Sequence, residues 1–426
     1  MAGIYIHVPF CKQACHYCDF HFSTSFKYKD ELVSALIKEI ELRKDEFKNT
    51  TVNTIYFGGG TPSVLAVSEL KRIIDAVYKH YQVNTNPEIT LEANPDDLIE
   101  ANKQTKNLIE AEAKVYSNQN NTNVSLSLSS SSRQAKVEDN SNENSITNES
   151  QNIFQAYKNI GINRLSIGVQ SFFEADLTLM NRAHNAKEAK ACISEAVTYF
   201  DNISIDLIYG IPNATNAQWE ENIKTALSFG IPHISTYALT VEPKTALQSL
   251  IQQGKIDNVN DELAQEQFYI LKDFLAENGF DHYELSNFSK PNYYSQNNSA
   301  YWLGKSYIGI GPSAHSFNGK QRSWNVANNI KYIKALAENS LPSEVETLTE
   351  NDRYNEYVMT GLRTIWGVSL ARITTDFGEN SHNYLLKQAK TYIKEQLLYI
   401  ENETLKTTKK GQFLCDGIAS ELFKIN

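Results

Sequence analysis

Residues 3–18 read Gly-Ile-Tyr-Ile-His-Val-Pro-Phe-Cys-Lys-Gln-Ala-Cys-His-Tyr-Cys. The apolar first half predicts a strand, and three of the five cysteines of the chain follow it directly. Thiols clustered at short spacing in a reducing compartment indicate metal or cluster ligands rather than disulfides. A cubane cluster or a tetrahedral zinc site needs four ligands, and this stretch supplies Cys11, Cys15 and Cys18. We therefore predict an iron–sulfur cluster with one iron left open to a ligand that is not protein.

The composition is that of an ordinary soluble globular protein. Of the 426 residues, 41% are hydrophobic and 21% are charged, and the net charge is −10. An acidic balance argues against broad nucleic-acid contact, which depends on Lys and Arg neutralising phosphates. The first ten residues lack the basic region of a signal peptide, and no apolar run reaches eighteen residues. We expect a cytoplasmic protein with no nucleic-acid partner and no integral membrane segment.

Strand-like and helix-like segments alternate along much of the chain. Strands are expected at 3–10, 52–57, 88–92, 161–168, 203–208 and 233–239, and helices at 28–47, 67–81, 153–160, 186–200, 217–229 and 262–278. This alternation predicts an α/β fold with a parallel sheet and right-handed crossovers, closed into a barrel or part of one.

Three regions are expected within this organisation. A partial-barrel core spans 1–240, a barrel-closing region rich in aromatic residues and glycines spans 241–327, and a mostly helical accessory domain spans 328–426. That last domain is expected to finish in a hairpin around Lys410-Gly411. Residues 102–152 are dominated by Ser, Asn, Thr, Gln, Glu and Lys, which cannot bury enough apolar surface to offset chain entropy, so this insertion is expected to be disordered.

The spacing of the three cysteines, with Tyr17 just before the last, resembles the signature of the radical S-adenosylmethionine superfamily. The resemblance implies a [4Fe–4S] cluster whose open iron is chelated by the methionine part of S-adenosylmethionine, and an electron from the cluster that cleaves the sulfonium. Two alternatives are a chance cluster of thiols and a zinc site completed by His7, His16 or His21.

The predicted ends of the strands can be checked against this expectation. Gly58–Gly60, Glu92, Gln170 and Asp206 all fall at carboxyl ends, where ligands bind in parallel sheets. A cofactor with an amino group, a ribose and an adenine needs close backbone approach, carboxylates and an amide. Each residue taken alone is as well explained as a turn or cap residue. Together they favour a cofactor site.

Longer strings extend the resemblance across nearly the whole chain outside the insertion. They resemble the coproporphyrinogen dehydrogenase-like radical S-adenosylmethionine proteins. The matching strings are Tyr5-Ile-His-Val-Pro-Phe-Cys11, Gly58-Gly-Gly-Thr-Pro62, Leu91-Glu-Ala-Asn-Pro95, Gly161-Ile-Asn-Arg-Leu-Ser-Ile-Gly-Val-Gln-Ser171, Asp206-Leu-Ile-Tyr-Gly-Ile-Pro212 and Gly309-Ile-Gly-Pro-Ser-Ala-His315. In the dehydrogenases of this family the pattern has a further cysteine where this chain has Phe20, and a longer segment precedes the first strand. Both departures favour the HemW-type haem-chaperone branch.

The resemblance implies roles for individual residues. It makes Cys11, Cys15 and Cys18 the cluster ligands. The expected S-adenosylmethionine contacts are Tyr5, Tyr17, Gly59, Gly60, Thr61, Glu92, Gln170, Arg182 and Asp206, with the guanidinium of Arg182 offsetting the carboxylate of the cofactor. The implied partners are haem, an unidentified haem-acceptor protein, and an electron donor such as a flavodoxin or ferredoxin.

The haem-linked motif of this branch is His-Asn, two residues, Tyr-Trp. Here the matching string is Asn297-Asn-Ser-Ala-Tyr-Trp302, so an amide stands where the branch has histidine. An amide is a poor ligand for haem iron compared with imidazole, thiolate or thioether. The expected haem residues are Asn298, Tyr301, Trp302 and His315. The axial ligand stays open among His315, His282 and Tyr301, or haem is held mainly by its flat faces.

Three hypotheses about function follow. The preferred one is a radical S-adenosylmethionine protein that binds haem and delivers it to acceptor proteins. The second is an oxygen-independent coproporphyrinogen III dehydrogenase (oxidase) or another radical enzyme acting on porphyrins. The third, a radical protein that modifies nucleic acid, is disfavoured by the acidic balance.

Overall fold

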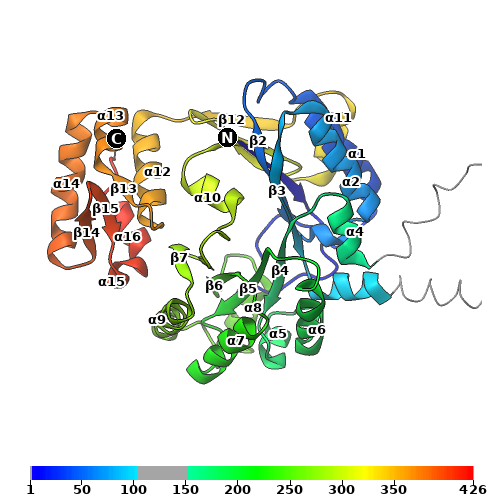
Figure 1. Ribbon diagram of the computed structural model, residues 1–426, viewed down its shortest axis with the longest axis horizontal. Helices are drawn as coiled ribbons and strands as arrows, with labels where there is room; N and C mark the ends of the chain where they lie inside the picture. The colour runs from blue at the N-terminus through cyan, green and yellow to red at the C-terminus, as the bar shows by residue number, and fades with distance from the viewer. Residues whose placement is uncertain (1, 104–151, 426) are drawn as a thin grey trace, which may run out of the picture.

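The structure, a computed structural model, describes residues 2–103 and 152–425 (Figure 1). The predicted disordered insertion falls almost entirely on 104–151, outside the described residues. At its two borders the chain is ordered. Residues 95–103 are helical, and the side chain of Asn152 accepts a hydrogen bond from the amide of Phe154 (2.9 Å), which caps the next helix.

A single twelve-stranded sheet organises most of the molecule. Its strand order is β12-β11-β10-β9-β1-β2-β3-β4-β5-β6-β8-β7. The strands are β1 (Ala2–Val8), β2 (Val52–Gly59), β3 (Val83–Ala93), β4 (Arg164–Gln170), β5 (Ile203–Tyr209), β6 (His233–Ala238), β7 (Asp281–Glu284), β8 (Asn287–Ser289), β9 (Ser306–Ile310), β10 (His315–Phe317), β11 (Gln321–Asn325) and β12 (Ser343–Thr347). Strands β1–β6 are parallel to one another, and β9 is parallel to β1. The expected α/β partial barrel is confirmed: the sheet has two edges, β12 and β7, and stays open.

Helices join the parallel strands and cover one face of the sheet, except α10, which follows β8 and contacts β1, β2 and β9 from the opposite face. They are α1 (Lys29–Leu42), α2 (Val67–His80), α4 (Ile153–Asn159), α5 (Glu174–Leu179), α6 (Ala186–Ala196), α7 (Asn216–Ser228), α8 (Ala246–Gln252), α9 (Asp261–Glu277), α10 (Gln296–Trp302) and α11 (Asn329–Ala337). Every helix expected before residue 280 is present. The short helices α5 and α8 had no signal in the sequence, because a segment of six or seven residues is too short to display a helical period.

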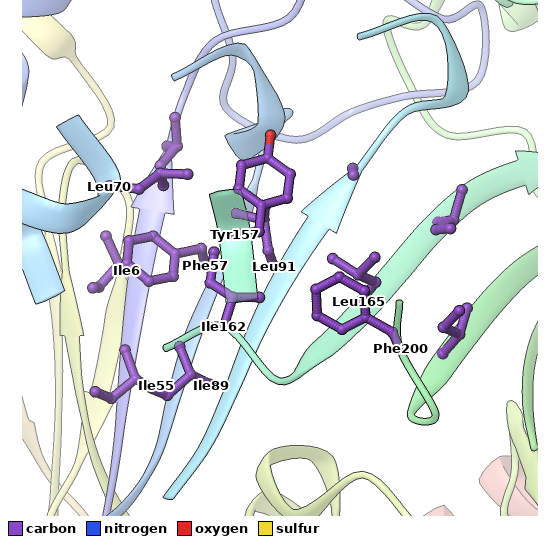
Figure 2. Close-up of a cluster of buried hydrophobic side chains, with 14 of the residues drawn as sticks. Ile6, Ile55, Phe57, Leu70, Ile89, Leu91, Tyr157, Ile162, Leu165 and Phe200 are labelled. Atoms are coloured by element: carbon purple, nitrogen blue, oxygen red, sulfur yellow. The ribbon is translucent and has the colours of Figure 1, made fainter. Parts of the chain in front are cut away.

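Alternate residues of each strand enter the main hydrophobic core between the sheet and its helices. Figure 2 shows Ile6, Phe57, Leu91 and Leu165, from four successive strands, in one such cluster. All four are 0% exposed, so each contributes about 1.5–3 kcal/mol of burial free energy.

The intervening residues point to the opposite face of β1–β6, which we call the lumen face. Tyr5 lies in register with Tyr56, Glu92 with Ser166, and Asp206 with Ser235. Partners in register between parallel strands put their side chains on the same face. This face lines a polar interior rather than a second hydrophobic layer. The parallel strands therefore alternate between apolar and polar residues.

A second hydrophobic core belongs to the C-terminal region, which lies beside the large sheet in Figure 1. Its elements are α12 (Glu350–Leu362), α13 (Leu370–Phe377), α14 (Glu379–Lys394), α15 (Lys409–Gln412), α16 (Cys415–Glu421) and a small sheet of β13 (Val368–Ser369), β15 (Thr404–Thr407) and β14 (Leu398–Glu401). The expected mostly helical character is confirmed.

The hairpin expected around Lys410-Gly411 is wrong in position. The hairpin is β14–β15, and its turn is Asn402-Glu403, both with left-handed φ angles (49° and 55°) that suit a two-residue turn. Lys410 lies in α15 instead, because the hydroxyl of Thr408 accepts a hydrogen bond from the amide of Gly411 (3.1 Å) and starts that helix.

In the described ranges, no helix is both long and apolar enough to cross a membrane.

Candidate functional site

The loop that carries the three cysteines leaves the carboxyl end of β1. It is closed at its base, where the amide of Cys11 donates to the carbonyl of Ser23 (3.1 Å) and the amide of Ser23 donates to the carbonyl of Pro9 (2.8 Å). Two distant segments hold its middle. The amide of His16 donates to the carbonyl of Met180 (3.1 Å), and the carbonyl of His16 accepts from the amide of Leu247 (2.8 Å). The loop is therefore fixed from both sides.

Tyr17 anchors this loop in a small apolar cluster. The half-buried ring packs against a satellite core that includes Leu177, Met180, Ile208 and Leu247. The aromatic residue before the last cysteine thus has a packing role, in addition to the cofactor contact implied by the resemblance.

A hydrogen-bond relay connects two of the cysteine sulfurs through three polar side chains. Thr61 Oγ1 donates to Cys11 Sγ (3.4 Å), and Asn94 Nδ2 donates to Thr61 Oγ1 (3.1 Å). Arg182 Nη2 donates to Asn94 Oδ1 (2.7 Å), and Arg182 Nη1 donates to Cys15 Sγ (3.2 Å). Hydrogen bonds to the sulfurs are one of the means by which a protein tunes an iron–sulfur cluster.

The donor set fits a cluster better than a single metal ion. Within the described residues, His, Cys, Asp and Glu side chains form no group of three that could hold one metal ion. In a cubane cluster each cysteine binds a different iron, so its sulfurs lie farther apart than the ligands of one zinc ion. Burial raises the pKa of Cys11 to about 11 and also raises that of Cys18, so these two thiols are neutral and must lose protons on metal binding.

The glycine turn after β2 packs tightly against the base of the cysteine loop. Its amides at Gly60 and Thr61 donate to the carbonyls of Val8 (2.9 Å) and Phe10 (2.7 Å). A Cβ at Gly60 would lie 2.7–2.8 Å from three backbone atoms of Val8 and Phe10, and Gly59 has a φ of +107° with His7 directly beside it. Close approach of two backbones requires glycine at position 60, and the left-handed φ together with the adjacent His7 ring requires glycine at position 59.

Two carboxylates face the lumen from neighbouring parts of the sheet. Glu92, on β3, accepts a hydrogen bond from the hydroxyl of Tyr56 (2.8 Å), and Asp206, on β5, accepts one from Ser166 (3.3 Å). Burial raises the pKa of Glu92 to about 7 and that of Asp206 to about 6. Glu92 lies at the carboxyl end of β3 as expected, whereas Asp206 lies in the middle of β5, because that strand runs on to Tyr209. Strongly perturbed carboxylates are typical of functional sites.

Tyr5 and Gln170 complete the group of predicted residues around the lumen. The ring of Tyr5 stacks on Tyr56 (centroids 6.1 Å apart), and its hydroxyl lies 3.3 Å from His7 Nδ1. Gln170 ends β4 in a left-handed conformation (φ 69°), which is uncommon for a residue other than glycine. Such strain persists where the surroundings enforce it, and it clusters at functional sites.

The residues predicted to contact haem do not lie in one group. Tyr301 lies near the C-terminal end of α10, and its ring is edge-on to that of Tyr307 on β9, with the ring centroids 4.5 Å apart. Asn298 lies in the first turn of α10, where its amide donates to Ser295 Oγ (3.3 Å). Trp302 contacts the guanidinium of Arg363 (5.5 Å), in the C-terminal region. His315 lies four strands from β3, on β10.

Asn297, which stands at the position of the motif histidine, is buried in the floor of the lumen. It is 2% exposed, and its Oδ1 accepts from Thr54 Oγ1 (2.9 Å). The floor is closed by Glu88, whose two carboxylate oxygens accept from the amides of Gln296 and Asn297 (3.1 Å each) at the start of α10.

Sequence reasoning missed two residues of this region. Asn94 links Thr61 to Arg182, and its signal was its place directly after a predicted strand. Arg164, on the lumen face of β4, is 1% exposed, and its Nε and Nη1 have no hydrogen-bond partner among the described residues. A charged residue inside an otherwise apolar strand was the available signal for Arg164.

Comparison with known proteins identifies the relatives of this chain. A family model described as the radical SAM superfamily matches residues 5–138, and one described as the HemN C-terminal domain matches 348–414. The chain is 30% identical to heme chaperone HemW of Bacillus subtilis over 97% of each chain. It is 28% identical to heme chaperone HemW of Mycobacterium tuberculosis over 99% of this chain and 94% of that protein.

Among solved structures, coproporphyrinogen III oxidase (HemN) from Escherichia coli, described as a radical SAM enzyme, has the same fold. Its TM-score is 0.76 at 21% identity, over 99% of this chain and 90% of that one. A likeness at that identity concerns the fold alone, whereas the identity to the curated relatives extends over the full length. The chain belongs to the HemW family of radical SAM proteins.

Proposed function

We propose that this protein is a haem chaperone: it binds haem in the cytoplasm and delivers it to acceptor proteins, with a [4Fe–4S] cluster and S-adenosylmethionine as cofactors. The observation that carries the proposal is the sequence identity of 28–30%, over nearly the whole chain, to proteins named heme chaperone HemW. The three-thiol loop and the polar lumen face support the cofactor assignment.

Cys11, Cys15 and Cys18 would hold the cluster. Thr61 and Arg182, which donate to two of these sulfurs, would stabilise the added negative charge of a reduced cluster. The cluster and S-adenosylmethionine together supply one-electron chemistry at the open iron.

The lumen residues would bind S-adenosylmethionine. Glu92 and Asp206 offer carboxylates to the ammonium and the ribose hydroxyls, and Arg182 offers a guanidinium to the carboxylate of the cofactor. Tyr5 would cover one side of the bound cofactor, Gln170 would offer an amide from its constrained backbone position, and the turn Gly59-Gly60 would border the methionyl end.

The electron donor would be a flavodoxin or a ferredoxin. The three-thiol loop is accessible for such a donor, because its cysteines are only partly buried and Phe20, two residues beyond the last cysteine, is 68% exposed.

The proposal is tested with anaerobically reconstituted full-length protein. Titration with haemin is expected to give a saturable Soret band. Incubation with coproporphyrinogen III, S-adenosylmethionine and a reductant is expected to give no protoporphyrinogen IX. Conversion at enzymatic rates, or the absence of saturable haem binding, would overturn the chaperone assignment. The variant Cys15→Ser separates the cofactors: it should lose the iron–sulfur absorbance after reconstitution and keep the Soret band.

A further inference from the structure

We propose that His315 is the axial ligand of haem in this chain, and that haem lies on an aromatic wall formed by Tyr307, Phe317 and Trp324. This inference rests on the proposed function. It assigns the iron ligand to strand β10 rather than to the position of the motif histidine in the family.

The position of the motif histidine cannot supply the ligand here. Asn297 is an amide, it is 2% exposed, and its oxygen accepts from Thr54. Its surroundings are also crowded, since Oδ1 would lie 3.3 Å from a Cβ built on Gly3. A flat macrocycle of haem size cannot reach an atom enclosed in this way without opening the floor of the lumen.

The other eight histidines are separated from such a site by burial, hydrogen bonding or position. Those that are buried or largely buried and hydrogen-bonded are His7, His184, His233 and His282. His16 and His21 belong to the cysteine loop and its base, where each uses one ring nitrogen in a hydrogen bond. His80 ends α2 beside Lys79, and His382 pairs with Glu379 on α14. Neither His80 nor His382 has an aromatic ring partner in the described residues.

His315 differs because it is exposed and has aromatic neighbours. It lies in register with Trp324, and the two rings are 6.1 Å apart. Phe317, two residues along the same strand, faces the same side, and its ring is 6.3 Å from that of Tyr307. The imidazole thus stands on the same face as two aromatic pairs, His315–Trp324 and Tyr307–Phe317, and aromatic faces are the kind of surface on which a porphyrin stacks.

This wall continues the lumen face outward. Tyr307 is in register with Gly3 on β1, and Tyr301 from α10 meets Tyr307 edge-on (4.5 Å). Haem on the wall would therefore lie next to the proposed S-adenosylmethionine site without occupying it. The two ligands could be present at the same time.

The charges at the wall suit a ligand with an electron-poor metal and two carboxylates. Arg322, in register with Phe317, pairs with Glu356 of α12 (2.5 Å) at the border with the C-terminal region. A haem propionate could share this guanidinium. Partial burial and the nearby Arg322 lower the pKa of His315, which favours the neutral imidazole that binds iron.

A single exposed imidazole also suits delivery. Haem held by one ligand on an open face keeps its other axial position free for a residue of the acceptor, whereas a fully enclosed haem would have to be released first. The expected complex is five-coordinate in the ferrous state.

The test uses full-length reconstituted protein titrated with haemin, and resonance Raman spectroscopy of the reduced complex. Wild type is expected to show an iron–imidazole stretching band. His315→Ala should lose this band, shift the Soret maximum and bind haem at least tenfold more weakly, and added imidazole should restore the band. Trp324→Ala should weaken binding while keeping the band. His382→Ala, which removes another histidine that is not in the hydrophobic core, is the matched control and should behave as wild type.

Each outcome decides the inference. If wild type binds haem and His315→Ala keeps both band and affinity, the ligand assignment is wrong although the chaperone proposal stands. Loss of the band in Asn297→Ala but not in His315→Ala would return the site to the lumen floor. If wild type binds no haem, both proposals fail. Circular dichroism of His315→Ala should match wild type, because the side chain is exposed.

Discussion

Arg182 Nη1 lies 3.2 Å from Cys15 Sγ, although 167 positions separate the two residues in the chain. The contact is set by the segment after α5, whose Asn181 also donates to the carbonyl of Ala14 (2.7 Å). The cysteine loop is therefore positioned by the fourth strand–helix unit as much as by its own strand, and groups far apart in sequence control the environment of the sulfurs.

Replacing Asn94 tests the relay between Thr61 and Arg182. Asn94→Ala removes one of the two acceptors of Arg182 Nη2, the other being the carbonyl of Gly168 (2.8 Å), so the guanidinium should be held less firmly toward Cys15. We expect at least tenfold weaker binding of S-adenosylmethionine by calorimetry and a changed electron paramagnetic resonance spectrum of the reduced cluster. Asn86→Ala, an exposed amide on β3, should change neither. Wild-type affinity and spectrum in Asn94→Ala would show that the relay has no role.

Gly60→Ala tests the packing of the glycine turn. The new Cβ would meet backbone atoms of Val8 and Phe10 at 2.7–2.8 Å, and backbone cannot move aside as a flexible side chain can. We expect displacement of the cysteine loop, seen as reduced iron content after reconstitution and a lower Tm.

Gly417→Ala is the control for this substitution. A Cβ there meets nothing within 4 Å, and the residue lies in helix α16, where alanine is favoured by roughly 0.5–1 kcal/mol. It should leave the iron content unchanged and raise the Tm slightly. Equal iron content in both variants would contradict the tight packing at Gly60.

Glu92→Gln tests the electrostatics of the lumen without ligand. Burial raises the folded-state pKa of Glu92 to about 7, above its ordinary value near 4.5. The folded protein then holds more protons than the unfolded chain between these two pH values, so this group makes the free energy of unfolding fall as pH rises through that window. The glutamine variant should not show this fall in the free energy of unfolding, and it should be more stable than wild type at pH 8 by on the order of 1–3 kcal/mol.

The measurement is the Tm of the cofactor-free protein from pH 4.5 to 8. The difference between variant and wild type should grow with pH and level off above about pH 7. Glu344→Gln, at an exposed glutamate of β12, should follow wild type throughout. A constant difference across the range would mean that Glu92 ionises normally.

Glu88 is predicted to hold the floor of the lumen. Glu88→Ala leaves the amides of Gln296 and Asn297 without their acceptor, at a cost of about 1–3 kcal/mol for each buried donor. We expect a lower Tm for Glu88→Ala, and a smaller loss for Glu88→Gln, which keeps one acceptor oxygen. Glu346→Ala on the exposed strand β12 serves as the control. An unchanged Tm in Glu88→Ala would show that solvent replaces the carboxylate at the floor.

Much of the fold was predictable because it depends on local patterns of residue types. The six parallel strands and the helices between them have apolar residues at regular spacing, and the strands end at glycines, amides or carboxylates. The carboxyl ends of parallel strands lie at one edge of a sheet, so the placement of Glu92 and Gln170 near each other followed from topology, whereas Asp206 lies in the middle of β5. The short helices α5 and α8 and the position of the last hairpin were not predicted, because they depend on caps and turn geometry at single residues.

The sequence by itself determined the family, the parallel character of the sheet and the three-thiol loop, since each depends on residue types in local patterns. Only the tertiary structure decided which distant groups face those residues. It brought Asn94 and Arg182 to the cysteine loop, buried Asn297 in the floor beside Thr54, and set the exposed His315 against the half-buried Trp324. Such contacts depend on strand register and on the packing of elements many residues apart, which no local pattern encodes.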